Sequence, residues 1–114
     1  MPHYNTESLE ILPPDGEVSC ADRLKVLADE TRLAVLRQLM AGPKLVGEIN
    51  EQMHVEQSLL SHHLKTLREA GLVISERDGK GVKYRLAPGV EMHAKSHSIN
   101  LGCCFLSFER PGST

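Results

Sequence analysis

Apolar residues recur every three or four positions through the first half of the chain, a spacing typical of amphipathic helices. A first short helix is predicted from Cys20, and a second begins after Asp29, whose side chain is a suitable N-cap. Gly42-Pro43 ends the second helix, and a third follows. A fourth runs from about Glu56 to Ala70 and is closed by Gly71. The apolar positions of the four helices are, in order, Leu24, Leu27 and Ala28; Leu33, Leu36, Leu39 and Met40; Leu45, Ile49 and Met53; Leu60, Leu64 and Leu67.

After the fourth helix the apolar residues follow a different pattern. Residues 73–77 and 82–86 are strand-like runs rich in valine, isoleucine and tyrosine. The connecting residues, Asp78-Gly79-Lys80-Gly81, contain two glycines that supply the positive backbone angles of a tight hairpin. The predicted fold class is therefore mainly α with a small β-hairpin, in the order of a helix-turn-helix followed by a wing.

The 114 residues, of which 40% are apolar, suffice for one compact core. We expect an irregular N-terminal arm over residues 1–18, where prolines and a glycine interrupt any periodicity. A winged helix-turn-helix DNA-binding domain is predicted over residues 19–88. Residues 89–114, after Pro88-Gly89, form a predicted dimerisation and sensing tail with a short helix at about Glu91 to Ser98.

Charge is unevenly distributed, although the net charge is only -2. Residues 1–30 contain seven acidic and two basic residues, whereas residues 57–87 contain six basic and three acidic ones. A local basic face is therefore predicted on the fourth helix and the hairpin. No apolar run is long enough to span a membrane and the first residues lack the features of a signal peptide, so a cytoplasmic protein with no membrane partner is expected.

The fourth helix and the hairpin provide the predicted DNA-binding residues. With its leucines turned to the core, the helix leaves small polar and basic side chains on its opposite face, suited to base edges and phosphates in a major groove. The basic side chains of the hairpin are suited to phosphate contact, although a solvated hairpin face is the simpler alternative. Leu59 is expected to be exposed, and His63 to have a core or interface role. The predicted DNA-binding set is Gln57, Ser58, Ser61, His62, Lys65, Arg77, Lys80, Lys83 and Arg85.

Three ordered segments, residues 27–33 (LADETRL), 57–73 (QSLLSHHLKTLREAGLV) and 79–86 (GKGVKYRL), closely resemble the signature of the ArsR/SmtB winged-helix repressors. The resemblance covers roughly residues 20–88. It implies a homodimeric repressor that binds palindromic double-stranded operator DNA and dissociates when a metal ion, metalloid or thiol oxidant occupies a sensing site. It also implies that the fourth helix enters the major groove while the wing lies over the adjacent backbone.

The known sensing sites of that family are only partly present. An arsenic-type Cys-Val-Cys pattern on the third helix is missing, because Leu45 and Gly47 stand at the matching positions. The zinc-type site on the last helix needs two ligand pairs, and only His93 and His97 come close. Their spacing suits a shared zinc or nickel ion, which keeps them as an alternative site.

The three cysteines are the predicted inducer site. Soft thiolates favour soft ions, and trivalent arsenic or antimony needs two or three thiolates and no fourth ligand. Cys103 and Cys104 are adjacent and supply two. The resemblance supports this role, since family members bind trivalent arsenicals through C-terminal cysteines. It also implies that Cys20, just before the first helix, lies near the tail and adds the third ligand from the same or the other subunit. The alternative for Cys20 is a buried, apolar packing role.

A competing function keeps the DNA-binding half and changes the signal. A thiol oxidant or persulfide would then form a disulfide between Cys20 and either Cys103 or Cys104, because a Cys103–Cys104 disulfide is strained. A small metal-transfer protein would leave the helix-turn-helix without a role. An enzyme is not expected, because the sequence lacks a Cys-x-x-Cys motif, a phosphate-binding glycine loop and an acid–base pair; no catalytic cofactor is expected either.

Overall fold

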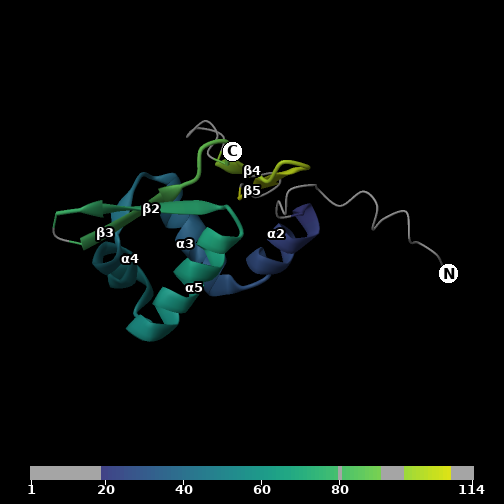
Figure 1. Ribbon diagram of the computed structural model, residues 1–114. Coiled ribbons are helices and arrows are strands. Elements are labelled where there is room, and N and C mark those ends of the chain that lie inside the picture. Colours follow the sequence, from purple (N-terminus) through teal and green to yellow (C-terminus); the bar gives the residue numbers. More distant parts are fainter. Residues whose placement is uncertain (1–18, 80, 91–96, 109–114) are drawn as a thin grey trace.

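The computed structural model describes residues 19–79, 81–90 and 97–108. Figure 1 shows the helices grouped beside a β-hairpin that projects to one side, with a second, smaller hairpin near α2. The arm expected over residues 1–18 lies outside the described residues. The described elements are α2 (Cys20–Leu27), α3 (Glu30–Met40), β1 (Lys44–Leu45), α4 (Val46–Met53), α5 (Gln57–Glu69), β2 (Val73–Asp78), β3 (Gly81–Leu86), β4 (Ser98–Asn100) and β5 (Phe105–Ser107).

Side-chain caps begin both α2 and α3, and the Asp29 cap between them was predicted from the sequence. The hydroxyl of Ser19 accepts a hydrogen bond from the backbone N–H of Asp22 at 3.1 Å and begins α2. The carboxylate of Asp29 accepts from the backbone N–H of Arg32 at 3.0 Å and begins α3. Each cap satisfies a donor that the first turn of a helix leaves unpaired. Two short helices therefore meet at Asp29 instead of one continuous helix.

Removing the Asp29 cap should destabilise the domain. The N–H of Arg32 holds the pKa of Asp29 below its ordinary value, because it donates to the ionised carboxylate. We expect Asp29→Ala to lower the free energy of unfolding by about 1 kcal/mol at pH 7. The lowered pKa means that the contribution of the charge is present above the unfolded pKa and is lost as the pH falls through the folded value. Urea unfolding at pH 7 and at progressively lower pH measures both effects.

Asp29→Asn is the matched control for this prediction, because asparagine caps a helix but does not titrate. Any stability advantage of the wild type over Asp29→Asn should shrink on acidification. A difference that is independent of pH would show that the ionised carboxylate is not its source.

One apolar core joins the helices to the sheet. Leu36, Leu39, Ile49, Leu64 and Leu67 come from three different helices and are each at most 1% exposed. Leucines at the helical spacing noted in the sequence thus meet in the interior, where burial of apolar surface is the main stabilising contribution. Among the described residues, no helix has the length and apolar character needed to cross a membrane.

The turn between α4 and α5 is fixed by one asparagine. His54 ends α4 in the left-handed conformation, with a φ of 56°. The side chain of Asn50 then forms two hydrogen bonds with the backbone of Val55, accepting at 2.9 Å and donating at 2.8 Å. This pair of bonds sets the angle at which α5 leaves the turn. A helix-turn-helix was predicted here, and the observed order confirms it.

The projecting hairpin belongs to a three-stranded antiparallel sheet with the order β1-β3-β2. Strands β2 and β3 pair from Val73 opposite Leu86 to Asp78 opposite Gly81, as predicted. The two-residue strand β1 was not predicted; it pairs with β3 through Lys44 and Leu45. This pairing ties the middle of β3 to the start of α4. Helix-turn-helix and wing are therefore held as one unit.

The tail contains a second antiparallel hairpin, β4–β5, which begins at the last residue of the short helix predicted at about 91–98. Residues 91–96 lie outside the described part, but Ser98 is in a strand, so the predicted C-terminal end of that helix is wrong. Ile99 and Leu101 are 0% and 2% exposed, which places alternate residues of one extended segment in the core. The extended conformation of this segment is therefore explained by the burial of every second side chain in the core.

Candidate functional site

Helix α5 presents a continuous polar face to solvent. Leu60, Leu64 and Leu67 are buried on its inner side. The five predicted DNA-binding residues of this helix are all exposed, and Leu59 beside them is 44% exposed: Gln57, Ser58, Ser61, His62 and Lys65. Amide, hydroxyl, imidazole and ammonium groups on one exposed helix face can donate to phosphates and base edges.

His63 is a buried polar residue on the inner side of α5. It is 7% exposed, and its Nδ1 lies 3.0 Å from Nη1 of Arg32 on α3. Nε of Arg32 also donates to the backbone carbonyl of Val26. Because arginine has no acceptor, Nδ1 of His63 accepts this hydrogen bond. The core role expected for His63 is confirmed, and Arg32 links α5 to the junction of α2 and α3, a contact that the sequence did not reveal.

Two basic residues of the wing form cross-strand ion pairs. Nζ of Lys83 lies 3.2 Å from Asp78, and Nε of Arg85 lies 3.0 Å from Glu76. All four side chains are between 38% and 53% exposed, and such surface pairs contribute only about 0–1 kcal/mol. Exchanging a carboxylate partner for a DNA phosphate therefore costs little. Arg77 is exposed on β2, and Lys80 lies outside the described residues.

The three cysteines meet at the end of the molecule where β4–β5 approaches α2 (Figure 1). Cys20 begins α2, whereas Cys103 and Cys104 lie between β4 and β5. A disulfide joins Cys20 to Cys103, with Cα atoms 6.1 Å apart. Cys104 is a free, exposed thiol whose Sγ lies 4.0 Å from that of Cys20. Residues 83 positions apart in sequence are thus brought together within one chain.

The donor set fits a trivalent, sulfur-seeking centre. The three Sγ atoms all lie within 4.8 Å of one another. Within the described ranges, no further histidine, cysteine, aspartate or glutamate belongs to this group. A structural zinc site needs four ligands, whereas a pyramidal arsenic or antimony centre is satisfied by three thiolates. His97 lies in a turn outside the cluster, and His93 is not among the described residues.

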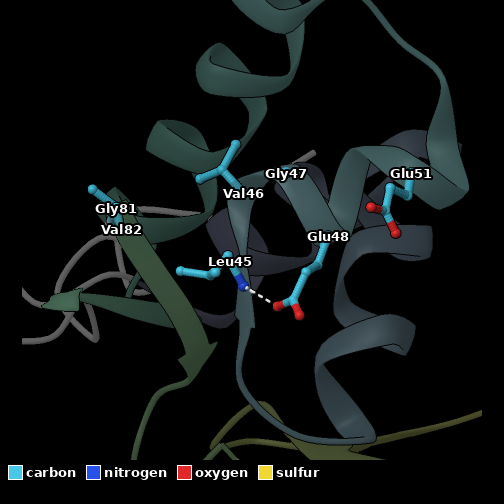
Figure 2. A pocket seen from close by; sticks show the side chains of 7 residues that line it. All are labelled: Leu45, Val46, Gly47, Glu48, Glu51, Gly81 and Val82. Atoms are coloured by element: carbon cyan, nitrogen blue, oxygen red, sulfur yellow. Dashed lines mark hydrogen bonds between the residues drawn. The ribbon is translucent and has the colours of Figure 1, made fainter. Parts of the chain in front are cut away.

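A shallow pocket lies between the start of α4 and β3, where the arsenic-type cysteines of other family members would stand. Figure 2 shows that its lining combines apolar side chains with the carboxylates of Glu48 and Glu51. Glu48 accepts a hydrogen bond from the N–H of Leu45 at 2.7 Å, so its carboxylate already caps α4. Among the lining residues of the pocket there is no cysteine or histidine. Its lining residues are Leu45, Val46, Gly47, Glu48, Glu51, Gly81 and Val82.

The sequence is similar to characterised bacterial regulators. Residues 29–75 match the family described as bacterial regulatory protein, arsR family. The chain is 42% identical to the transcriptional repressor SmtB of Mycobacterium tuberculosis over 77 residues, 66% of this chain and 57% of that protein. It is 37% identical to the biofilm growth-associated repressor of Xylella fastidiosa over 86 residues, 75% of this chain and 72% of that protein.

A third relative is the arsenical resistance operon repressor of Escherichia coli, 40% identical over 67 residues, 58% of this chain and 57% of that protein. The chain thus spans less than two thirds of the length of SmtB and of this arsenical repressor.

Solved structures show the same architecture. HlyU from Vibrio cholerae has a TM-score of 0.57 and 37% identity, over 59% of this chain and 73% of that one. A homodimeric winged helix-turn-helix domain from Mycobacterium bovis has a TM-score of 0.56 and 33% identity, over 59% of this chain and 62% of that one. The predicted fold class is confirmed. Together with the sequence matches, the architecture shows that the chain belongs to the ArsR/SmtB family of winged helix-turn-helix transcriptional regulators.

Proposed function

We propose that the protein is a homodimeric repressor that binds operator DNA and is released by a trivalent arsenical held by Cys20, Cys103 and Cys104. The observation that carries this proposal is the convergence of three sulfur atoms within 4.8 Å. Arsenite, methylarsenite and antimonite share the chemistry that such a cluster recognises. The operator-binding part rests on family membership and on the exposed polar face of α5.

The proposed DNA contacts divide into two kinds. Gln57, Ser58 and Ser61 at the start of α5 read base edges, with His62 and Lys65 beside them on the same face. Arg77, Lys80, Lys83 and Arg85 on the wing contact phosphates, which provide affinity without sequence preference. Each phosphate contact adds about 0.9 to the steepness with which the logarithm of the binding constant falls with the logarithm of the salt concentration. Binding should therefore weaken steeply as salt rises.

Dimerisation is supported by the homodimeric relative, and it matches the two-fold symmetry of the palindromic operator that we propose. We place the interface on α2 and the region after Pro88. Leu24 on α2 is 47% exposed and Phe105 on β5 is 65% exposed, so both carry apolar surface that a second copy can cover. Two recognition helices would then lie about one DNA turn apart.

The binding reaction of the sensing site balances with water as the leaving group. Arsenite, As(OH)3, exchanges its three hydroxyls for three thiolate sulfurs and releases three water molecules. Methylarsenite has two exchangeable hydroxyls and needs only two thiols. Both reactions require reduced cysteines, so a dithiol reductant such as dithiothreitol must first supply two electrons and two protons to the Cys20–Cys103 disulfide and leave two thiols.

That disulfide supports a second candidate function, the sensing of thiol oxidants or persulfides. Oxidation of Cys20 and Cys103 links α2 to the tail through the same atoms that an arsenical would bridge. The two signals therefore differ in chemistry but act at one place. Zinc or nickel sensing through His93 and His97 is not supported by an observation of this kind, because His93 lies outside the described residues.

Fluorescence anisotropy of a labelled promoter fragment tests the proposal. The reduced protein should bind the fragment, and arsenite or methylarsenite should weaken binding about 5- to 150-fold, the range of typical allosteric coupling. Zinc should have little effect. Release by peroxide, reversed by dithiothreitol, with no response to arsenite would favour the oxidant sensor. Release by zinc alone would contradict both thiol-based functions.

A further inference from the structure

The side chain of Arg23 connects the thiol hairpin to the DNA-reading helix. Its Nε donates to the backbone carbonyl of Ala70 at 3.1 Å, and its Nη1 donates to the carbonyl of Leu101 at 3.0 Å. Ala70 is the C-cap of α5, and Leu101 lies two residues before Cys103. One guanidinium therefore holds the end of the proposed recognition helix and the approach to the proposed inducer site.

Gly71 leaves room for this guanidinium, and Gly102 lies in ordinary contact distance of it. A Cβ atom on Gly71 would lie 3.0 Å from Nη2 of Arg23, and one on Gly102 would lie 3.6 Å from Nη1. Both glycines have positive φ values, 77° and 98°, which other residues adopt only with strain. Backbone from two distant parts of the chain thus closes around one planar side chain.

Arginine suits this position better than lysine. Its rigid fork can direct separate N–H groups to two carbonyls, whereas an ammonium is a point charge on a flexible stem. The C-terminal end of α5 also carries partial negative charge, which favours a cation there. This second effect is independent of the thiols, so it stabilises the fold without transmitting a signal.

The bond to Leu101 depends on where the thiol hairpin lies. Arg23 is three residues after Cys20 on α2, so the two side chains share one face of the helix. Joining Cys20 to Cys103 therefore fixes Leu101 against the same helix that carries Arg23. We propose that Arg23 is the positioning residue that transmits closure of the thiol cluster to the C-terminal end of α5. The inference deepens the proposed function and rests on it for the identity of the signal.

Three variants test the proposal: Arg23→Met, which removes both bonds; Arg23→Lys, which keeps the charge; and Lys25→Met, which removes an exposed cation from the same helix. Operator affinity is measured with and without arsenite, and arsenite binding is measured separately from arsenic–thiolate absorbance. The readout is the ratio of the two operator affinities. Urea midpoints show whether each variant is folded.

Arg23→Met should bind arsenite with wild-type stoichiometry, while its release ratio falls from the wild-type 5- to 150-fold to less than about 2-fold. Arg23→Lys should be intermediate, and Lys25→Met should match the wild type. A wild-type release ratio in folded Arg23→Met would overturn the inference. If Arg23→Met is unfolded, the release ratio of Arg23→Lys decides: a ratio equal to that of the wild type overturns the proposal.

A second measurement separates this inference from the proposed function. Diamide closes the Cys20–Cys103 disulfide by taking two electrons and two protons from the thiols, without arsenic or DNA. In the wild type, closure should shift the NMR amide signals of Gly71 and Leu72, and in Arg23→Lys these shifts should be smaller. Equal shifts in both proteins would refute the role of Arg23. Failure of wild-type protein to release DNA with arsenite would instead refute the proposed inducer.

Discussion

Serine at both Cys103 and Cys104 should abolish release by arsenicals while operator binding by the free protein stays near the wild-type level. These thiols lie between β4 and β5, and neither is among the proposed DNA contacts on α5 and the wing, so their loss removes ligands without removing a DNA contact. A ligand can release DNA only to the extent that it prefers the free conformation. The entire coupling, about 5- to 150-fold in operator affinity, should therefore disappear.

Cys20→Ser distinguishes the possible inducers. Arsenite uses three thiolates, so its effect should be lost, whereas methylarsenite should still bind Cys103 and Cys104, as arsenic–thiolate absorbance measures, without joining the tail to α2. An oxidant response should also be lost, because Cys20 is a partner in the observed disulfide. Anisotropy titrations with each inducer measure these outcomes.

The control for the cysteine variants is His97→Ala, which should respond to arsenicals like the wild type. Normal arsenical-driven release by the Cys103→Ser, Cys104→Ser double variant would contradict the proposed site. Loss of release in His97→Ala would instead direct attention to the histidines of the tail.

Truncating Leu64 should have the largest effect on stability. Leu64 is 1% exposed and lies on the inner side of α5, where it joins the core shared by helices and sheet. We expect Leu64→Ala to lower the free energy of unfolding by about 2–5 kcal/mol, since it leaves a cavity in a close-packed interior. Thermal or urea unfolding measures the loss.

Lys65→Ala is the matched variant on the outer face of the same helix. Lys65 is exposed, so its removal should leave the unfolding midpoint almost unchanged and weaken operator binding. If Lys65 contacts a phosphate, the slope of the logarithm of the binding constant against the logarithm of the salt concentration should also become shallower by about 0.9. An unchanged operator affinity in Lys65→Ala would place the DNA on another face.

The helices were predictable because their determinants are local. Asp29 was predicted to cap α3 and does so in the structure, and the leucines of α5 repeat at the helical period. The hairpin β2–β3 was likewise indicated by alternating residues around two glycines. Strand β1 has only two residues, which is too short to show a period, and depends on pairing with β3.

The tail was harder to predict because its structure depends on distant contacts. Strands β4 and β5 have three residues each, and their conformation depends on burying Ile99 and Leu101 in a core built mainly from other elements. The sequence identified all three cysteines, and the family resemblance suggested that Cys20 lies near the tail. Arg23 was missed, because one arginine on a short helix gives no sign of two carbonyl partners 47 and 78 positions away.

The link between Cys20 and Cys103 has a consequence for protein turnover. It closes a loop with a sequence separation of 83, which contains all the helices of the DNA-binding domain and its wing. In the chain-entropy model, closing a loop of this size disfavours the unfolded state by about 4.5 kcal/mol. Proteases that cleave the opened chain act in proportion to its population. A molecule closed by oxidation or by a bridging arsenic atom should therefore be degraded more slowly than an open one for as long as the loop stays closed.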